Sequence, residues 1–168
     1  LKLMQDSFDA AHVTLILRPP SPNTSGVLLN TREADPNATA FYQHHFFAFD
    51  PFVDLPTNTV VTPQEMLGDR WNRSPMLRDY LLPLDVEHLV GADIRTREGV
   101  ECRFRISRYR GARPFDAEDR ALCKFLLPHL TRSIQLRTML DNLDCEREVV
   151  SGTVTRMLVG VLSLSAEG

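Results

Sequence analysis

The stretch HLVGADIRTREGVECRFRISRYR (88–110) decides the fold. It holds two runs in which apolar and polar residues alternate, a pattern typical of strands with one buried face. A two-residue loop between the runs would oppose Arg95 to Cys102 and mix polar with apolar side chains. A three-residue loop opposes Arg95 to Glu101 and puts Gly99 in the left-handed position that such loops favour. The sequence therefore predicts an antiparallel hairpin in the second register.

In this register the two faces of the hairpin differ in chemistry. Arg95 lies opposite Glu101 and Asp93 opposite Arg103 on the polar face, where each pair contributes roughly 0.2–1 kcal/mol. A slip by one residue would bury arginines, so burial of the apolar face fixes the register. That apolar face consists of Val90, Ala92, Ile94, Cys102, Phe104 and Ile106.

Residues before the hairpin predict another strand pair and several helices. Residues 11–18 and 26–31 form a second hairpin, and residues 1–8 resemble the end of a helix. A helix is predicted to start at Asp35-Pro36 and to end at Asp50-Pro51. Thr62-Pro63-Gln64-Glu65 starts a further helix, because it combines a capping threonine, a proline at the first position and a glutamate at the third. Another helix is expected over 71–82, closed by Pro83.

After the hairpin, a long helix is predicted to begin at Asp116 and to reach about residue 150. Acidic residues fill its first turn, and Pro128 should kink it. Its leucines lie roughly along one side, and its length suggests a partner helix. Residues 159–165 alternate like a strand, and no strand follows the turn at 166–168, so we expect a piece of a longer protein.

The order of these elements predicts an α+β fold, with an antiparallel sheet flanked by helices and a long C-terminal helix. The 168 residues are the size of one ordinary domain. The formal net charge is −3, which argues against nucleic-acid binding by this chain alone. No apolar stretch approaches the length of a membrane span, and three widely spaced cysteines form no disulfide framework. We therefore expect a cytoplasmic protein with reduced thiols.

Three stretches resemble a known family. They are FYQHHFFAFDPF (41–52), LRDYLLPLDVEHLVGADIRTREGVECRFRI (77–106) and FDAEDRALCKFLLPHLTRSIQL (115–136). Together they are similar to the GAF/PAS-like N-terminal sensor domain of bacterial LuxR-type helix-turn-helix transcription regulators. The resemblance implies a sensor domain over 1–145, which includes the start of the long helix. It implies a connecting helix and the truncated start of a following PAS-like domain over 146–168.

The resemblance also bears on two possible binding partners, DNA and a small-molecule ligand. DNA would be bound only through a C-terminal helix-turn-helix, for which this chain has no candidate. The spacing of Phe46 and Asp50-Pro51 resembles the Tyr…Asp-Pro turn of acyl-homoserine-lactone-binding domains, but phenylalanine stands in the tyrosine position. The residues that hold the lactone and the amide have no clear match, so the resemblance does not name the ligand.

A small-molecule pocket is predicted between the sheet and the aromatic helices. Tyr42, Trp71 and Tyr80 are favoured because each carries a polar group that needs a partner when buried. Plain core packing is the alternative interpretation. The candidate ligand-binding residues are Tyr42, Phe46, Phe49, Trp71, Tyr80 and Phe104.

Other kinds of site find little support in the sequence. His44, His45 and His88 show no metal-ligand spacing, and neither a catalytic motif nor a cofactor-binding loop is present, so we predict no enzyme, no metal and no cofactor. All but two of the 19 basic residues are arginine, with Lys2 and Lys124 as the lysines. The register leaves Arg105, Arg108, Arg110 and Arg113 unpaired, which predicts a solvated face, with attraction of an anionic ligand or partner as the alternative.

Two functions remain open, with an enzyme as a distant third. The first is a ligand-sensing domain whose occupancy tilts the long helix toward an output. The second is a dimerisation module without a ligand, in which the helix over 116–150 pairs two subunits. An enclosed cavity with polar groups would favour the first, and a filled core with a large apolar helix surface would favour the second.

Overall fold

Four antiparallel strands form the sheet, in the order β2-β1-β4-β3. They are β1 (His12–Arg18), β2 (Val27–Asn30), β3 (Val86–Arg95) and β4 (Glu101–Tyr109). The computed structural model describes residues 1–18, 27–31, 52 and 55–166, and the following statements concern those residues. The α+β fold predicted from the sequence is confirmed. The helix predicted from Asp35-Pro36 lies outside the described residues.

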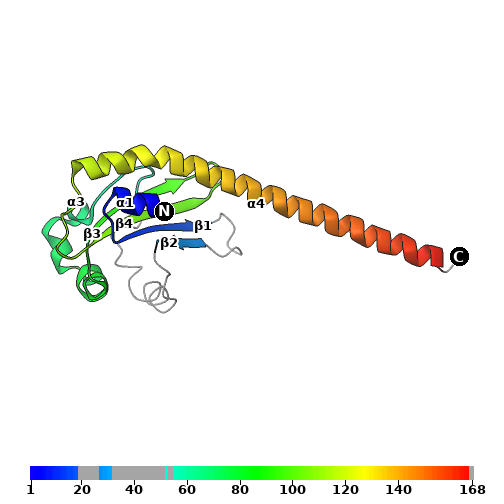
Figure 1. The fold of residues 1–168 in the computed structure, drawn as a ribbon, viewed down its shortest axis with the longest axis horizontal. Helices are drawn as coiled ribbons and strands as arrows, with labels where there is room; N and C mark the ends of the chain where they lie inside the picture. Colours follow the sequence, from blue (N-terminus) through cyan, green and yellow to red (C-terminus); the bar gives the residue numbers. More distant parts are fainter. Residues whose placement is uncertain (19–26, 32–51, 53–54, 167–168) are drawn as a thin grey trace. The chain divides into compact units, whose positions relative to one another are not determined.

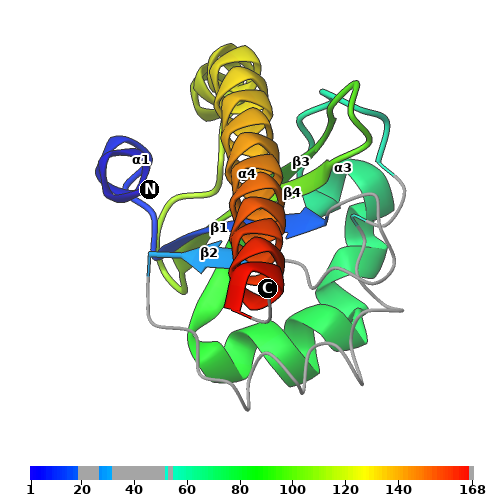
Figure 2. The same cartoon turned by 90° about the vertical axis from the view of Figure 1, so that its right-hand side faces the viewer.

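Both hairpins have the predicted pairing. β1 and β2 pair side by side, with Leu15 opposite Leu29 (Figure 2). In the β3–β4 hairpin Arg95 lies opposite Glu101, and Gly99 in the loop has a φ of +85°. None of the six apolar side chains predicted to face the core is more than 1% exposed. Burial therefore fixes this register, as expected.

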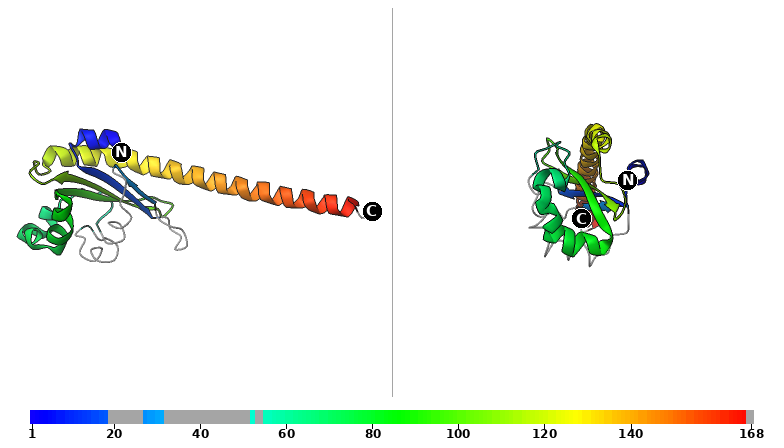
Figure 3. Two further views of the ribbon diagram at one scale, coloured as in Figure 1. Left: turned by 60° about the horizontal axis from the view of Figure 1, so that its bottom comes forward. Right: turned by 90° about the vertical axis from the view of Figure 1, so that its left-hand side faces the viewer.

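Helices cover both faces of the sheet. α1 (Lys2–Ser7) and the first turns of α4 (Ala117–Ala166) lie on one side, and the short helices between residues 63 and 84 lie on the other (Figures 1 and 3). Cys123 and Leu127 of α4 are almost completely buried. The sheet is thus the middle layer of the domain, and a side chain's place along its strand decides which helices it meets.

The capping box predicted at Thr62 is present at the start of α3 (Pro63–Leu67). The Glu65 backbone N–H donates to Thr62 Oγ1 at 3.3 Å, and the Thr62 backbone N–H donates to Glu65 Oε2 at 2.9 Å. Pro63 occupies the first helical position. These two bonds satisfy donors that the first helical turn leaves open.

The single helix predicted over 71–82 is wrong in detail. The segment instead consists of η3 (Gly68–Arg73), the π-helical η4 (Met76–Leu81) and η5 (Leu82–Leu84). The break falls at Ser74, whose ψ of 140° is extended, because the residue before Pro75 avoids the helical region. Pro83 lies inside η5 and does not close the helix.

Helix α4 begins where the sequence predicts and extends further. The Asp116 carboxylate accepts the backbone N–H groups of Glu118 and Asp119 at 2.9 and 3.0 Å. The helix continues through Pro128 to Ala166, so the strand predicted over 159–165 is wrong. A helix satisfies its backbone groups locally and needs no partner strand. Contacts divide the chain into two units, Leu1–Thr131 and Arg132–Gly168, and the predicted domain boundary after residue 145 stays a prediction.

Within the described residues, no helix combines the length and apolar character that crossing a membrane requires.

Candidate functional site

The sheet face beneath the short helices carries an ion pair. Arg105 of β4 lies 2.8 Å from Asp93 of β3, and their side chains are only 12% and 14% exposed. The Arg105 guanidinium also donates to the carbonyl oxygens of Ala92 and Phe104, each at 2.9 Å, and to that of Phe52 at 3.3 Å. Its Cζ lies 4.6 Å from the centre of the Phe52 ring. Backbone carbonyls, a carboxylate and an aromatic face thus hold this cation in one position.

This arrangement corrects the charge pairing predicted for the hairpin. Asp93 lies opposite Arg103 in the register but pairs with Arg105, two residues further along β4. The predicted Arg95–Glu101 pair is confirmed at 3.2 Å, on an exposed part of the hairpin. Arg105 is therefore neither unpaired nor part of a solvated face.

Gly91 allows this close packing. A Cβ atom at this position would lie 2.8 Å from Arg105 Cδ and 3.1 Å from two carbons of the Phe52 ring. Both distances are shorter than ordinary van der Waals contacts, and Arg105 cannot move without losing its bonds. A glycine inside a strand marks close approach of another group, and here that group is the Arg105–Phe52 stack.

A hydrophobic cluster, which we call the Trp71 cluster, lies on the same side of the sheet. Trp71 is its largest member and has no exposed surface. Tyr80 is half-buried against the cluster, and burial raises the pKa of its hydroxyl. The buried members are Phe52, Leu55, Trp71, Met76, Leu77, Leu81, Val86 and Leu89.

Buried polar atoms of Trp71 and Asp93 on this side lack a hydrogen-bond partner among the described residues. They are Trp71 Nε1, a donor, and Asp93 Oδ1, an acceptor whose contact with Arg105 lacks hydrogen-bond geometry. An unpaired buried polar group costs about 1–3 kcal/mol, so most such groups in proteins have partners. Each of these two atoms is therefore open to a further hydrogen bond.

The structure brings together only part of the predicted ligand site. Trp71 and Tyr80 lie in one cluster. Phe104 is fully buried, but it alternates with Arg105 along β4 and therefore faces the opposite side of the sheet. The positions of Tyr42, Phe46 and Phe49 lie outside the described residues. Sequence reasoning missed Gly91, Asp93 and Arg105, although a glycine inside a strand was a signal for close packing.

The opposite face of the sheet holds a second charged centre, built on Arg108. This side chain has no exposed surface, so the solvated face predicted for it is wrong. It donates two hydrogen bonds to the Asp119 carboxylate, at 2.9 and 3.0 Å, and two to the Phe8 carbonyl, at 2.6 and 3.0 Å. Its Cζ stacks 4.1 Å from the centre of the Phe115 ring. Arg108 therefore joins β4, the end of α1 and the start of α4.

Arg113, also predicted to be unpaired, belongs to the same centre. Its guanidinium donates to both Asp119 carboxylate oxygens, at 2.8 and 2.9 Å, and to Asp116 at 2.6 Å. Burial alone would raise the pKa of Asp119, but hydrogen bonds from Arg108, the Asp116 backbone and Arg113 lower it to about 2. Asp119 is therefore ionised throughout the neutral range.

The described residues give little support to catalytic or metal chemistry. Cys102 and Cys123 are buried and free, and burial raises the pKa of each thiol to about 12. Neither thiol has the thiolate character of a nucleophile or metal ligand. Within this part of the chain, no three histidine, cysteine or acidic side chains form a group that could hold a metal ion.

Neither family models nor curated proteins match this sequence. Among the solved structures that share its fold are two of SdiA and one of a GAF domain. A crystal structure of Escherichia coli SdiA matches with a TM-score of 0.55 and 14% identity, over 82% of this chain and 57% of that chain. SdiA in complex with octanoyl-rac-glycerol matches with a TM-score of 0.59 and 17% identity, over 84% of this chain and 57% of that chain. The photoproduct state of a GAF domain from Synechocystis sp. PCC6803 matches with a TM-score of 0.54 and 11% identity, over 84% of this chain and 92% of that chain.

These similarities show that the chain shares its fold with SdiA and with a GAF domain. The chain spans little more than half the length of the SdiA chains it matches.

Proposed function

We propose that this chain is a ligand-sensing regulatory domain of a bacterial LuxR-type transcription regulator. A small molecule binds on the side of the sheet that carries Asp93, Arg105 and the Trp71 cluster. The observation that carries this proposal is a pair of buried polar atoms, Trp71 Nε1 and Asp93 Oδ1, that lack a hydrogen-bond partner among the described residues. Asp93 Oδ1 is held by the Arg105 charge but accepts no hydrogen bond. A ligand with an acceptor and a donor would satisfy both and remove the penalty of burying them. The complex of the similar protein SdiA with octanoyl-rac-glycerol supports a ligand of this size class.

Ligand binding should raise the melting temperature of the purified chain. The probes are octanoyl-rac-glycerol, N-acyl homoserine lactones and a library of small metabolites. A compound present at 100 times its dissociation constant adds roughly 2.7 kcal/mol to the free energy of unfolding. Trp71 is the single tryptophan of the chain, so its fluorescence emission should change with the same compound.

Trp71→Phe is the matched variant, because phenylalanine keeps an aromatic ring in the cluster and removes the unpaired Nε1–H. The proposal predicts that this variant folds but gains less melting temperature from the same compound. A wild-type chain that responds to no compound would contradict ligand sensing.

The second candidate function is dimerisation through α4, favoured by its exposed apolar residues. Leu136, Met139, Leu140 and Leu143 are between 53% and 59% exposed, on a helix whose sequence predicts a partner. A second copy of this chain would cover them with the same residues, as in a symmetric dimer. A regulator that senses and dimerises would use both surfaces, so the two candidates are compatible.

Light scattering at micromolar concentration should give twice the mass of one chain. Leu140→Glu places a charge on the exposed apolar surface and should yield monomers. Leu3→Glu is the control, because Leu3 is an equally simple leucine that is 83% exposed on α1. A monomeric wild-type chain would refute this candidate without affecting the ligand proposal.

A further inference from the structure

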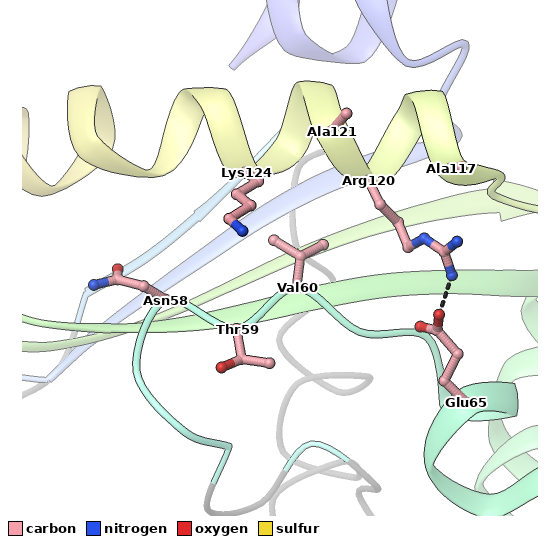
Figure 4. A pocket seen from close by; sticks show the side chains of 8 residues that line it. All are labelled: Asn58, Thr59, Val60, Glu65, Ala117, Arg120, Ala121 and Lys124. Carbon is pink, nitrogen blue, oxygen red and sulfur yellow. Dashed lines mark hydrogen bonds and ion pairs between the residues drawn. The ribbon is translucent and has the colours of Figure 1, made fainter.

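A cavity of about 390 Å³ lies between the first two turns of α4 and residues 58–65 (Figure 4). At about 30 Å³ for each water molecule, the cavity has room for roughly a dozen waters or a small organic molecule. It involves none of the residues of the proposed sensing site. The lining residues are Asn58, Thr59, Val60, Glu65, Ala117, Arg120, Ala121 and Lys124.

One wall of the cavity is fixed to the edge of the sheet. The backbone groups of Val61 and Gly91 exchange two hydrogen bonds, at 3.0 and 2.9 Å, and the Asn58 N–H donates to the Asp93 carbonyl at 2.8 Å. The Val60 side chain, between these anchor points, rises toward α4 in Figure 4. This wall therefore offers an apolar surface held in place by the sheet.

The other wall is one face of α4. Its four lining residues recur at helical spacing, in the order Ala117, Arg120, Ala121 and Lys124, so that small and long side chains alternate along this face (Figure 4). The two alanines leave space where larger side chains would fill it. A ligand in this cavity would thus meet Val60 on one wall and the alanines and two cations of α4 on the other.

The charges of the two cations are compensated differently. Arg120 forms an ion pair with Glu65 Oε1, while the other oxygen of Glu65 accepts the Thr62 backbone N–H. Glu65 is thereby occupied, and its charge is balanced by Arg120. Lys124 has no hydrogen bond or ion pair within the described residues, and its ammonium group reaches toward the space between Asn58 and Val60 (Figure 4). The lining carries one uncompensated positive charge.

From this geometry we infer that the cavity binds a small organic anion. Its oxyanion, a carboxylate or a phosphate, contacts the Lys124 ammonium, and its short apolar part lies between Val60 and the two alanines. The ligand would join the first turns of α4 to the edge of the sheet. The inference rests on the cavity alone and does not require the proposed sensing function.

Lysine NMR tests this inference directly, because the chain has only two lysines, Lys2 and Lys124. The protein is labelled with ¹³C at lysine Cε and titrated at constant ionic strength with hexanoate, hexyl phosphate, inorganic phosphate and the neutral 1-hexanol. We expect a saturable shift of the Lys124 signal with hexanoate or hexyl phosphate, and whichever binds identifies the oxyanion. Lys2, which pairs with Asp6 on α1, is the internal control and should not saturate.

Two variants separate binding from general charge effects. Lys124→Gln removes the cation, and Ala121→Leu fills the cavity without changing its charge. Binding, followed through backbone amide signals of residues 58–60, should weaken at least tenfold in both, and Lys2→Gln should bind like the wild type. The inference is overturned if both lysine signals shift in parallel without saturation, if no anion shifts Lys124, or if both cavity variants bind normally.

Discussion

Asp119→Asn is expected to lower the free energy of unfolding by about 3–5 kcal/mol, because it leaves the buried Arg108 guanidinium without its counter-charge. Arg108 has no exposed surface, and Asp119 is 6% exposed. Two hydrogen bonds at 2.9 and 3.0 Å join them, so one carboxylate neutralises this cation between β4 and α4. Urea denaturation at pH 7, followed by circular dichroism, measures the loss.

The control is another aspartate paired with an arginine in α4. Arg137 and Asp141 form an ion pair 2.8 Å apart, but their side chains are 74% and 57% exposed. Such surface pairs contribute about 0–1 kcal/mol, so Asp141→Asn should change stability little. If the two variants lost the same stability, the Arg108–Asp119 pair would not hold the domain together.

A double variant distinguishes an unpaired charge from lost packing. Arg108→Met combined with Asp119→Leu removes both charges, and it should lose less stability than Asp119→Leu alone. The reason is that a buried ion pair can often be replaced by apolar residues, whereas removal of one partner strands the other.

The Arg108–Asp119 pair should also make the free energy of unfolding depend on pH in the acidic range. The pKa of Asp119 is lowered from its ordinary 3.8 to about 2 in the folded state, so the unfolded chain binds the proton first as pH falls. The stabilisation from Asp119 is therefore complete above pH 4 and is lost as pH falls toward 2. Asp119→Asn should remove this part of the pH dependence of unfolding.

The β3–β4 hairpin could be predicted almost completely from the sequence. Alternation, a glycine in the loop and the cost of burying arginines together admit one register. The caps at Thr62 and Asp116 were also predictable, because each is a local pattern of side chain and backbone. These features depend on neighbours in sequence, or on one pair of strands.

Features that depend on distant contacts could not be predicted in the same way. Arg108 lies two residues after Ile106 and four after Phe104 on β4, so it shares their buried face of the sheet. The usual exposure of arginine suggested the opposite. Only the fold shows that Asp119 and the Phe8 carbonyl meet it there. Likewise, alternation over 159–165 predicts a strand only if another strand lies beside it.

The candidate sensing site was predictable in its aromatic part alone. Trp71 and Tyr80 stood out because they combine an apolar body with a polar group. Asp93 was assigned to a cross-strand pair with Arg103, and the unpaired Arg105 to a solvated face, so the sequence did not predict that either is buried. Their burial depends on the Trp71 cluster, which includes Phe52. Most residues of this cluster lie earlier in the sequence, outside the hairpin.

Trp71→Ala should produce the other large loss of stability, about 3–5 kcal/mol. Trp71 is completely buried in a cluster of eight buried side chains, and alanine would leave a cavity that the sheet prevents from collapsing. Urea denaturation followed by circular dichroism measures this loss, since the variant no longer contains tryptophan. A loss below about 1 kcal/mol would show that the cluster rearranges to fill the space.

Trp71→Phe should lose much less, because two effects oppose each other. The smaller ring loses some packing, but the substitution also removes a buried N–H that lacks an acceptor among the described residues. An unsatisfied buried donor costs about 1–3 kcal/mol, which offsets much of the lost packing. If Trp71→Phe were as unstable as Trp71→Ala, Nε1 would have an acceptor in the unliganded protein. The case for a ligand at this atom would then fail, while the packing role of Trp71 would stand.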